Sequence, residues 1–495
     1  MPPAPDPLAR PSPRIRHASV RRSHGRHRRR PAAGPARRRL LLTRSAAAAA
    51  LLLSLAVGLT TEGPTAWGLL PIALYAVLAL TGTSLVTVTA LALVSAALVV
   101  LPAPGKAADV LGGSVTDPVT VIGLIIVFGA ATGEVLRVTG VADTLVRSIL
   151  RLTDGRGRTV LMYGMMLACL VLVASLGTLA GALAIAGPLL VPVAARTGFT
   201  RSATAATMFL GGCAGLALAP FAGSNIAIMD TADAGYLLYV AVGAGPLAVL
   251  SLLLAAVVVP WVQRRSAAQQ DFYRPEEAAE EPSDAAGRPD RARRATWAFA
   301  LTLVITVGYA TVTRAGTTFP LIALPLLSAV TVAAAGLPPG RAVRAFLTGA
   351  RRMLPMLALF WMLAALFGFI DLAKPYDVVL DTFGPELRHM SALPFALAVA
   401  ALGWVGVPGA TAAQVILIGE VFGPLGTELG IGPAAWVVVL LWASKADTYG
   451  PLPNANMVGT MGLARADRLP YLLGTGWALL IPACALYTVL LVFIL

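Results

Sequence analysis

Apolar residues recur along the chain in runs long enough to cross a lipid bilayer, separated by short segments rich in glycine, proline or charge. A helix needs about 20 mostly apolar residues to cross the hydrocarbon core, because it rises only about 1.5 Å per residue. The pattern predicts helices rather than a membrane barrel, which would show short alternating segments. The predicted spans lie near residues 43–61, 67–82, 84–101, 119–137, 202–222, 236–262, 297–314, 319–336, 353–370, 433–449 and 469–495.

Two further apolar pairs, 159–176 with 178–195 and 392–407 with 411–424, carry glycine or proline between their halves. Each pair is either two full spans or a re-entrant hairpin that enters and leaves on one side. Arginine is enriched in cytoplasmic loops, and its distribution fits both interpretations because they leave the other helices in the same orientation. We expect an all-α polytopic membrane protein with about eleven transmembrane helices and two opposed re-entrant hairpins.

Two polar segments divide the chain into regions. Residues 1–44 carry thirteen arginines and one acid, and residues 1–42 are expected to form a disordered, Arg/Pro-rich cytoplasmic tail that contacts anionic membrane lipid. This tail has no aromatic residue or folded module that would indicate nucleic-acid binding. Residues 264–296 carry seven acids and seven arginines. They predict a cytoplasmic linker between an N-terminal membrane half, 43–263, and a C-terminal half, 297–495.

The two membrane halves contain the same order of helix-breaking residues. Residues 175–229 and 406–461 each begin with a Gly-rich tip, continue through a small-residue helix with a Gly-Pro pair, and reach an apolar helix, a proline and an Asn-containing cluster. A shift of 231 residues pairs Pro220 with Pro451, and it also pairs two of the asparagines. Because the repeats have opposite predicted orientations, they form the pattern of a secondary transporter built from inverted-topology repeats.

Each repeat predicts a hairpin followed by a broken helix. The first unit has its hairpin at 159–195 and its broken helix at 202–232, and the second has them at 392–424 and 433–464. Broken helices free backbone polar groups, which a membrane tolerates only where protein or a polar cavity satisfies them. Freed carbonyls can hold a cation, and the N-terminus of a restarted helix attracts an anion. Substrate and ion sites are therefore expected at the tips and breaks.

The tips "SLGT" and "VPGAT" and the breaks "PFAGSN" and "PLPNAN" resemble those of the ion transporter superfamily. This clan contains divalent-anion/sodium symporters, citrate, gluconate and lactate permeases, and related antiporters. The resemblance covers roughly residues 119–262 and 353–495. It implies a homodimer in which a mobile transport domain moves in elevator fashion against a scaffold. Neither tip contains a complete Ser-Asn-Thr sequence, so the resemblance selects no family, substrate or coupling ion.

The tips and breaks supply the candidate substrate-binding residues. The candidates at the tips are Ser175, Gly177, Thr178, Gly409 and Thr411. Glycine there permits close approach of the backbone to a ligand, or simply a tight turn. The candidates at the breaks are Ser224, Asn225, Asn454 and Asn456. Their side chains either bind a substrate carboxylate or a cation, or only cap the restarted helix.

Two charges, Lys445 and Asp447, lie within the predicted span 433–449. Charged residues inside spans are costly and are functional hypotheses by default. We expect Lys445 to bind an anionic substrate or to replace a bound cation, and Asp447 to carry a proton or a sodium ion. Glu420, on an arm of the second hairpin, is another candidate ion carrier. The alternative is that Lys445 and Asp447 lie near the membrane interface and are solvated.

The favoured function is ion-coupled secondary transport of a small organic anion, such as a carboxylate, across the cytoplasmic (inner) membrane. The coupling ion is Na+ or H+. The alternatives are a cation/proton antiporter and, from a different class, a membrane protein without transport activity. The sequence contains no phosphate-binding loop, zinc-protease motif or nucleophile elbow, so no enzymatic activity and no cofactor are expected. Three scattered cysteines and four histidines give no metal-ligand spacing. The N-terminus is expected in the cytoplasm and the C-terminus outside.

Overall fold

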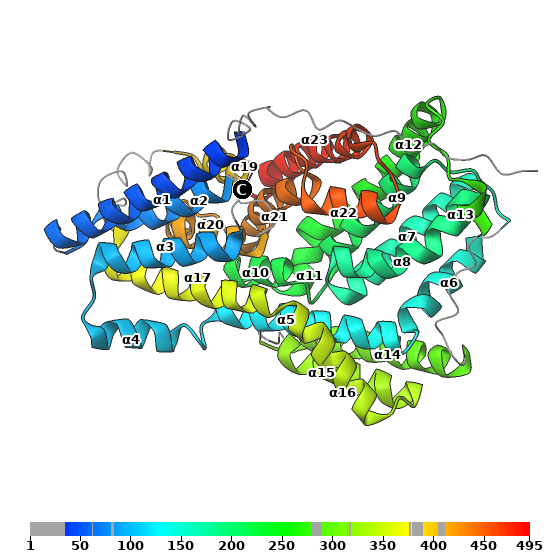
Figure 1. The fold of residues 1–495 in the computed structure, drawn as a ribbon, viewed down its shortest axis with the longest axis horizontal. Helices are drawn as coiled ribbons and strands as arrows, with labels where there is room; N and C mark the ends of the chain where they lie inside the picture. The colour runs from blue at the N-terminus through cyan, green and yellow to red at the C-terminus, as the bar shows by residue number, and fades with distance from the viewer. Residues whose placement is uncertain are drawn as a thin grey trace, which may run out of the picture. The chain divides into compact units, whose positions relative to one another are not determined.

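Helices form nearly all the regular structure of the computed structural model (Figure 1), which describes residues 35–495 except 62, 81–83, 154, 280–288, 314, 316–317, 376–377, 379–389 and 404–410. The helices of the first half are α1 (Pro35–Thr60), α2 (Leu70–Leu80), α3 (Leu85–Val100), α4 (Pro104–Gly113), α5 (Pro118–Val138), α6 (Val141–Thr153), α7 (Arg158–Leu176), α8 (Leu179–Arg196), α9 (Arg201–Leu218), α10 (Gly223–Thr231), α11 (Tyr236–Tyr239) and α12 (Gly245–Ala267). The linker and the second half contain α13 (Pro275–Ala279), α14 (Pro289–Val312), α15 (Pro320–Ala335), α16 (Pro339–Arg352), α17 (Leu354–Ala373), α19 (Ala392–Leu402), α20 (Thr411–Glu428), α21 (Pro433–Tyr449), α22 (Ala455–Leu463) and α23 (Leu469–Ile494).

The expected all-α polytopic class is confirmed. Seven helices in the described part are long and apolar enough to cross a membrane, or eight if the bent pair α9–α10 counts as one span. Six shorter apolar helices accompany them. The arms α7 and α8 both pass the length test for separate spans. The count of eleven spans and the re-entrant nature of 159–195 and 392–424 therefore stay predictions.

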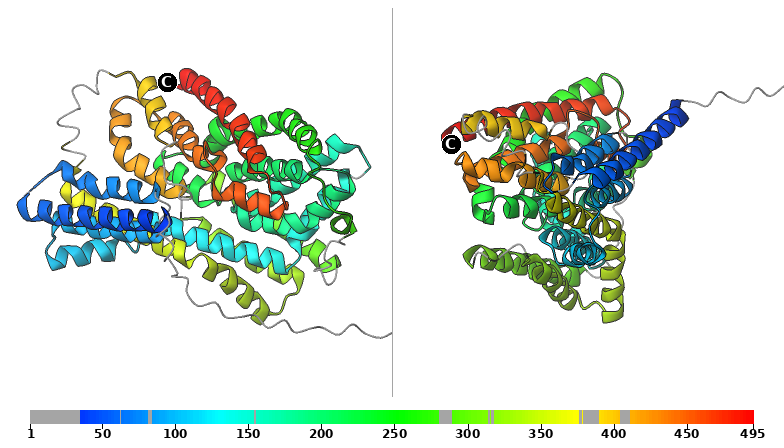
Figure 2. Two further views of the ribbon diagram at one scale, coloured as in Figure 1. Left: turned by 45° about the horizontal axis from the view of Figure 1, so that its top comes forward. Right: turned by 90° about the vertical axis from the view of Figure 1, so that its left-hand side faces the viewer.

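The two predicted repeats pack against each other within the unit formed by residues Ala46–Leu495. α10 packs on α20, and α22 packs on both α8 and α9. These helices, green and orange in Figures 1 and 2, are far apart in sequence but adjacent in space. Of the predicted tail at 1–42, residues 1–34 lie outside the described part, and α1 already begins at Pro35.

Each broken helix lies in backbone contact with an arm of its own hairpin. In the first repeat, a side chain at Gly211 or Gly215 of α9 would place its Cβ only 2.4 or 2.3 Å from a carbonyl oxygen of α7. In the second repeat, a Cβ at Gly403, which ends α19, would lie 2.3 Å from the α21 backbone at Ala443. Small residues allow this approach, as they do generally between helices in membranes. The contact fixes each hairpin arm beside its break.

Residues 263–277, which comprise the end of α12 and the first part of the linker, form a strap that caps the start of α9. Gln263 Oε1 accepts a hydrogen bond of 2.9 Å from the amide of Thr200. Asp271 Oδ2 accepts one of 3.0 Å from the amide of Ser202 and one of 2.5 Å from its hydroxyl. These bonds satisfy amide groups in the first turn of α9, which no intrahelical carbonyl reaches. They attach the linker to the first repeat.

The same strap also binds the loop that follows the second broken helix. Tyr273 Oη donates to the carbonyl of Ala464 at 2.9 Å. The Glu277 carboxylate bridges two arginines, since Arg201 Nη2 lies 2.8 Å from Oε2 and Arg465 Nη1 lies 3.2 Å from Oε1. The strap therefore joins the first turn of α9 to the end of α22.

The close contact of α7 with α9 predicts that even one methyl group added between these helices lowers the free energy of unfolding. In Gly215→Ala, the added Cβ meets the Leu170 carbonyl, so the helices must separate. We expect a loss of about 1–3 kcal/mol, as for other overpacked cores. It would be measured as a lower thermal unfolding midpoint of the detergent-purified protein. Gly474→Ala is the matched control, because no atom lies within 4 Å of its added Cβ. Equal midpoints for the two variants would contradict the contact.

The bridge at Glu277 predicts a pH-dependent contribution to stability. Burial alone raises the pKa of Glu277, but the Arg274 amide and the guanidinium groups of Arg465 and Arg201 outweigh it, so the pKa lies below its usual value of 4.5. Such a carboxyl contributes stability that is present at neutral pH and is lost as the pH falls through the folded-state pKa. Glu277→Gln should therefore lower the unfolding midpoint near neutral pH, and the difference from wild type should shrink below pH 4.5. The neighbouring exposed Glu276→Gln is the control, and a difference that does not change with pH would refute the bridge.

Candidate functional site

The first break separates α9 from α10, whose axes differ by 42°. Asn225 is fully buried just after this break, and its Nδ2 donates to carbonyl oxygens at the end of α9. The acceptors are Leu216 at 2.8 Å, Ala217 at 3.1 Å and Ala219 at 2.8 Å. The Asn225 Oδ1 in turn accepts from the Ser224 hydroxyl at 3.3 Å. The amide nitrogen thus binds the protein's own freed carbonyls, and Ser224 is the half-buried polar group beside them.

The second break, between α21 and α22, uses a different asparagine. Asn454 Oδ1 accepts from the Met457 amide at 2.9 Å, and its Nδ2 donates to the Thr448 carbonyl at 3.0 Å. Asn454 therefore connects the end of one helix to the start of the next. Asn456, which the sequence shift pairs with Asn225, is half-buried and has no side-chain hydrogen bond within the described part of the chain. Binding of substrate by these asparagines stays a prediction.

The first hairpin tip lies against the first break. Gly177 has a φ of +66°, and a Cβ at this position would be 3.3 Å from the backbone of Ala222 in the break. The Ser175 hydroxyl donates to the Val171 carbonyl at 2.7 Å, and Thr178, the residue before α8, makes no side-chain hydrogen bond to the start of that helix. The structure therefore brings the predicted tip and break of the first repeat together.

The second tip lies mostly outside the described residues. Gly409 is among the positions left out, and Thr411 is the half-buried first residue of α20. Three residues on, Gln414 has only 5% of its surface exposed. Neither of its side-chain polar atoms has a hydrogen-bond partner in the described structure.

Lys445 is buried in α21, with 1% of its surface exposed. The same helix packs beside the first broken helix, since the ring of Tyr449 in α21 lies 6.3 Å from that of Phe209 in α9. This placement disagrees with a solvated position at the membrane interface. Asp447 belongs to the same helix, but its side chain lies outside the described part.

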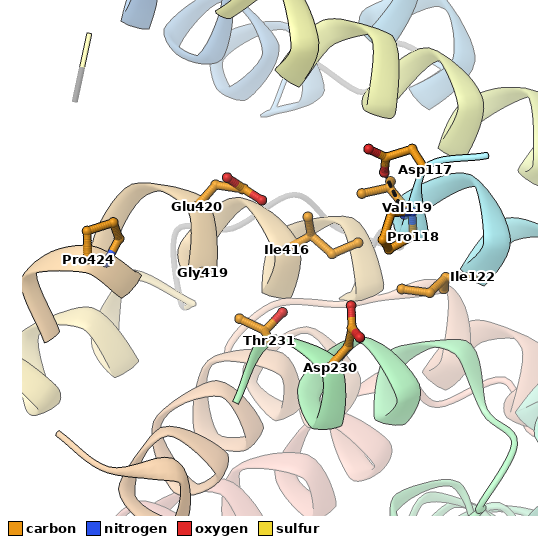
Figure 3. A pocket seen from close by; sticks show the side chains of 10 residues that line it. All are labelled: Asp117, Pro118, Val119, Ile122, Asp230, Thr231, Ile416, Gly419, Glu420 and Pro424. Carbon is orange, nitrogen blue, oxygen red and sulfur yellow. Dashed lines mark hydrogen bonds between the residues drawn. The ribbon is translucent and has the colours of Figure 1, made fainter. Parts of the chain in front are cut away.

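A cavity of about 360 Å³ places Glu420 near two acids that the sequence analysis did not select (Figure 3). We call it the carboxylate cavity. Asp117 precedes α5 and accepts from the Val119 amide at 2.8 Å, and Asp230 lies at the end of α10. The described lining residues include no base: they are Asp117, Pro118, Val119, Ile122, Asp230, Thr231, Ile416, Gly419, Glu420 and Pro424.

The three carboxylates of this cavity do not form a metal-ligand cluster. No group of three His, Cys, Asp or Glu side chains in the described ranges could hold a metal ion together. The cavity still has room for a cation with part of its water shell, and carboxylates at its wall favour positive charge. It therefore suits protons or hydrated cations better than an anion.

A larger cavity of about 850 Å³ shares Asp230 with the first. We call it the aromatic cavity, because Phe221, Tyr236 and Phe319 line it. Its wall comes from the first break, from α10 and α11, and from the facing ends of α14 and α15. Neither cavity was predicted from the sequence, since the lining residues of each come from distant parts of the chain.

Glu134 is another buried acid, but it lines neither cavity and its carboxylate forms ion pairs that join helices. It has 7% of its surface exposed, and its carboxylate accepts from Arg137 Nη2 at 2.6 Å and Nε at 3.0 Å. Arg352 Nη1 of α16 lies 3.3 Å from the same carboxylate. These pairs neutralise the buried charge and tie α5 to the second half of the chain. The carboxylate cavity has no such basic neighbour among its described lining.

The amide of Asn225 should be essential for the stability of the break. Asn225→Leu keeps the branched shape of the side chain but leaves several buried carbonyls without their donor, at a cost of roughly 3 kcal/mol. The measurement is the thermal unfolding midpoint in detergent. Asn456→Leu is the control, because that side chain forms no hydrogen bond in the described structure and should change the midpoint little. Similar losses in both variants would argue against the proposed cap.

Comparison with known proteins relates the first half of the chain to one protein family. Residues 34–262 match a family model described as the Na+/H+ antiporter family. No curated protein matches the sequence significantly. The superfamily resemblance is not itself confirmed by these comparisons.

Two solved structures share the fold. The YdaH transporter of Alcanivorax borkumensis is 19% identical with a TM-score of 0.53, and the match covers 77% of this chain and 87% of that one. MtrF of Neisseria gonorrhoeae, from a class of antimetabolite efflux pumps, is 13% identical with a TM-score of 0.57, over 89% and 97% of the respective chains. The chain is therefore a multi-pass membrane protein that shares the fold of these two transporters, and its residues 34–262 match the model of the Na+/H+ antiporter family.

Proposed function

We propose that the chain is a secondary antiporter that exchanges a cation for protons across the cytoplasmic membrane. The observation that carries this proposal is the carboxylate cavity, where Asp117, Asp230 and Glu420 line one space whose described wall contains no base. An anionic substrate would be repelled there, whereas a cation or a proton would be stabilised. The match of residues 34–262 to the Na+/H+ antiporter family supports the same activity.

Exchange follows from competition for the same oxygens. A carboxylate binds a cation only when it is ionised, and protonation releases that cation. Because carboxylates that line one cavity repel each other's charge, full ionisation is unfavourable, and a proton is retained until a cation replaces it. Glu420 is exposed at the cavity wall, so it is the group we expect to receive ions from solvent first.

Alternating access is proposed to use an elevator-type movement. Asp230 on α10 and Glu420 on α20 belong to the two repeats, which pack together, whereas Asp117 belongs to the start of α5. Movement of the repeats against α5 would separate Asp117 from the other two acids and open the cavity. A homodimer, in which a second copy holds the scaffold still, is part of this proposal.

Transport of a small organic anion is a second candidate function. The buried Lys445 in α21 favours it, because a cation this far from solvent can bind a carboxylate strongly. The starts of α10 and α22, beside Ser224, Asn225, Asn454 and Asn456, would add helix-terminal N–H groups. Asp447 would then carry the coupling Na+ or H+.

The test reconstitutes the purified protein in proteoliposomes with a pH gradient and an internal pH dye. Addition of Na+, K+ or Li+ should dissipate the gradient without any organic substrate. Asp117→Asn, Asp230→Asn and Glu420→Gln should each weaken the apparent cation affinity by about tenfold, which corresponds to the loss of one favourable charge interaction. Asp109→Asn is the control, since this exposed acid of α4 lies outside the cavity.

The same experiment has an outcome that would refute antiport and support transport of an organic anion. If no cation dissipates the gradient but radiolabelled carboxylates accumulate under a sodium or proton gradient, antiport is wrong and the organic-anion function replaces it. In that case Lys445→Ala should abolish uptake, while Asp117→Asn should leave substrate affinity near the wild-type value.

A further inference from the structure

We propose that the aromatic cavity is a second binding site, for an organic cation with an apolar or aromatic body. This inference deepens the proposed antiport and rests on it for the exchange step. At about 850 Å³, the cavity falls within the size range of sites for small organic molecules. A small inorganic ion would gain little from its apolar wall and would lose its hydration there.

The aromatic wall is rigidly held, which favours binding of a flat apolar body. Tyr236 donates its hydroxyl to the Leu218 carbonyl at 2.7 Å and stacks on Tyr239 with ring centres 6.4 Å apart. Phe319 packs on Tyr309 with ring centres 5.7 Å apart. The hydroxyl of Tyr236 is already used and one face of its ring stacks on Tyr239, so the opposite face is the one that can contact a ligand. Aromatic faces attract cations as well as apolar groups.

The charged residues of the aromatic cavity favour a positively charged ligand. The charged side chains among its described lining residues are Asp230 and Asp233, and both are acids. Asp233 has a φ of +48° and donates its amide to the Asp230 carbonyl at 3.1 Å. That turn holds the two acids next to one another along the cavity wall. They would bind an ammonium group while the aromatic rings contact the rest of the molecule.

Asp230 also lines the carboxylate cavity, so the two sites share one acid. A proton or inorganic cation on Asp230 removes its charge from the aromatic cavity. An organic cation bound to Asp230 from the aromatic cavity likewise removes the charge of Asp230 from the carboxylate cavity. The sites therefore compete, and an organic cation would be exchanged for the ion that the carboxylate cavity holds.

The test measures binding of ethidium, an aromatic monocation, to the detergent-purified protein by fluorescence polarisation. We expect saturable binding that Na+ and protons weaken competitively. Asp230→Asn, Asp233→Asn and Phe319→Ala should each weaken it by about tenfold, the effect of losing one charge or ring contact. Asp290→Asn and Phe493→Ala, which alter exposed residues outside the cavity, are the matched controls.

The site and the proposed antiport can fail separately. Ethidium binding that is unchanged by Asp233→Asn and Phe319→Ala overturns the site, even if cation/proton exchange is present. Binding that these variants weaken supports the site, even if proteoliposomes show no exchange, and in that case only the antiport is refuted. A cavity filled by a lipid chain would show ethidium binding that added phospholipid abolishes and that Asp233→Asn does not change, which also overturns the proposal.

Discussion

The structure depends on satisfying the backbone groups that two interrupted helices expose in an apolar environment. Without water, each unpaired carbonyl is costly, so a break persists only where a donor replaces the missing helical amide. At the first break that donor is the buried amide of Asn225, helped by the hydroxyls of Tyr236 and Tyr239, which donate to Leu218 and Ala217 at 2.7 Å. Because these donors belong to α10 and α11, the same bonds that permit the break also fix the acids and rings that follow it.

Close packing turns this local solution into a site. Glycines at the α7–α9 contact let a hairpin arm reach the broken helix, and Gly177 brings the tip to the break itself. The second repeat reaches the same arrangement with the glycine on the hairpin side, at Gly403. Both repeats therefore need a small residue where the hairpin arm meets the broken helix. In the first repeat that residue lies on the broken helix, and in the second it lies on the hairpin.

Short-range signals from proline and glycine made the fold class, the two helix breaks and the first hairpin tip predictable from the sequence. Proline and glycine act within a few residues, so Pro220 and Pro451 mark the interruptions directly. The choice of Asn454 over Asn456 was not predictable, because the prolines align the repeats but do not fix where each helix restarts. Asp117 and Asp230 were missed for another reason. Their role depends on Glu420, which is distant in sequence, and no local pattern distinguishes them from ordinary acids at helix ends.

The linker strap has a consequence for how the chain is made. Its bonds to the start of α9 join residues 63 and 69 positions apart, so they can form while the second half is still being synthesised. Its bonds to Ala464 and Arg465 span 191 and 188 positions. These cannot form until the second repeat has left the ribosome. The strap is therefore completed in two stages. Its bonds to Ala464 and Arg465 form only once the second repeat has packed beside the first.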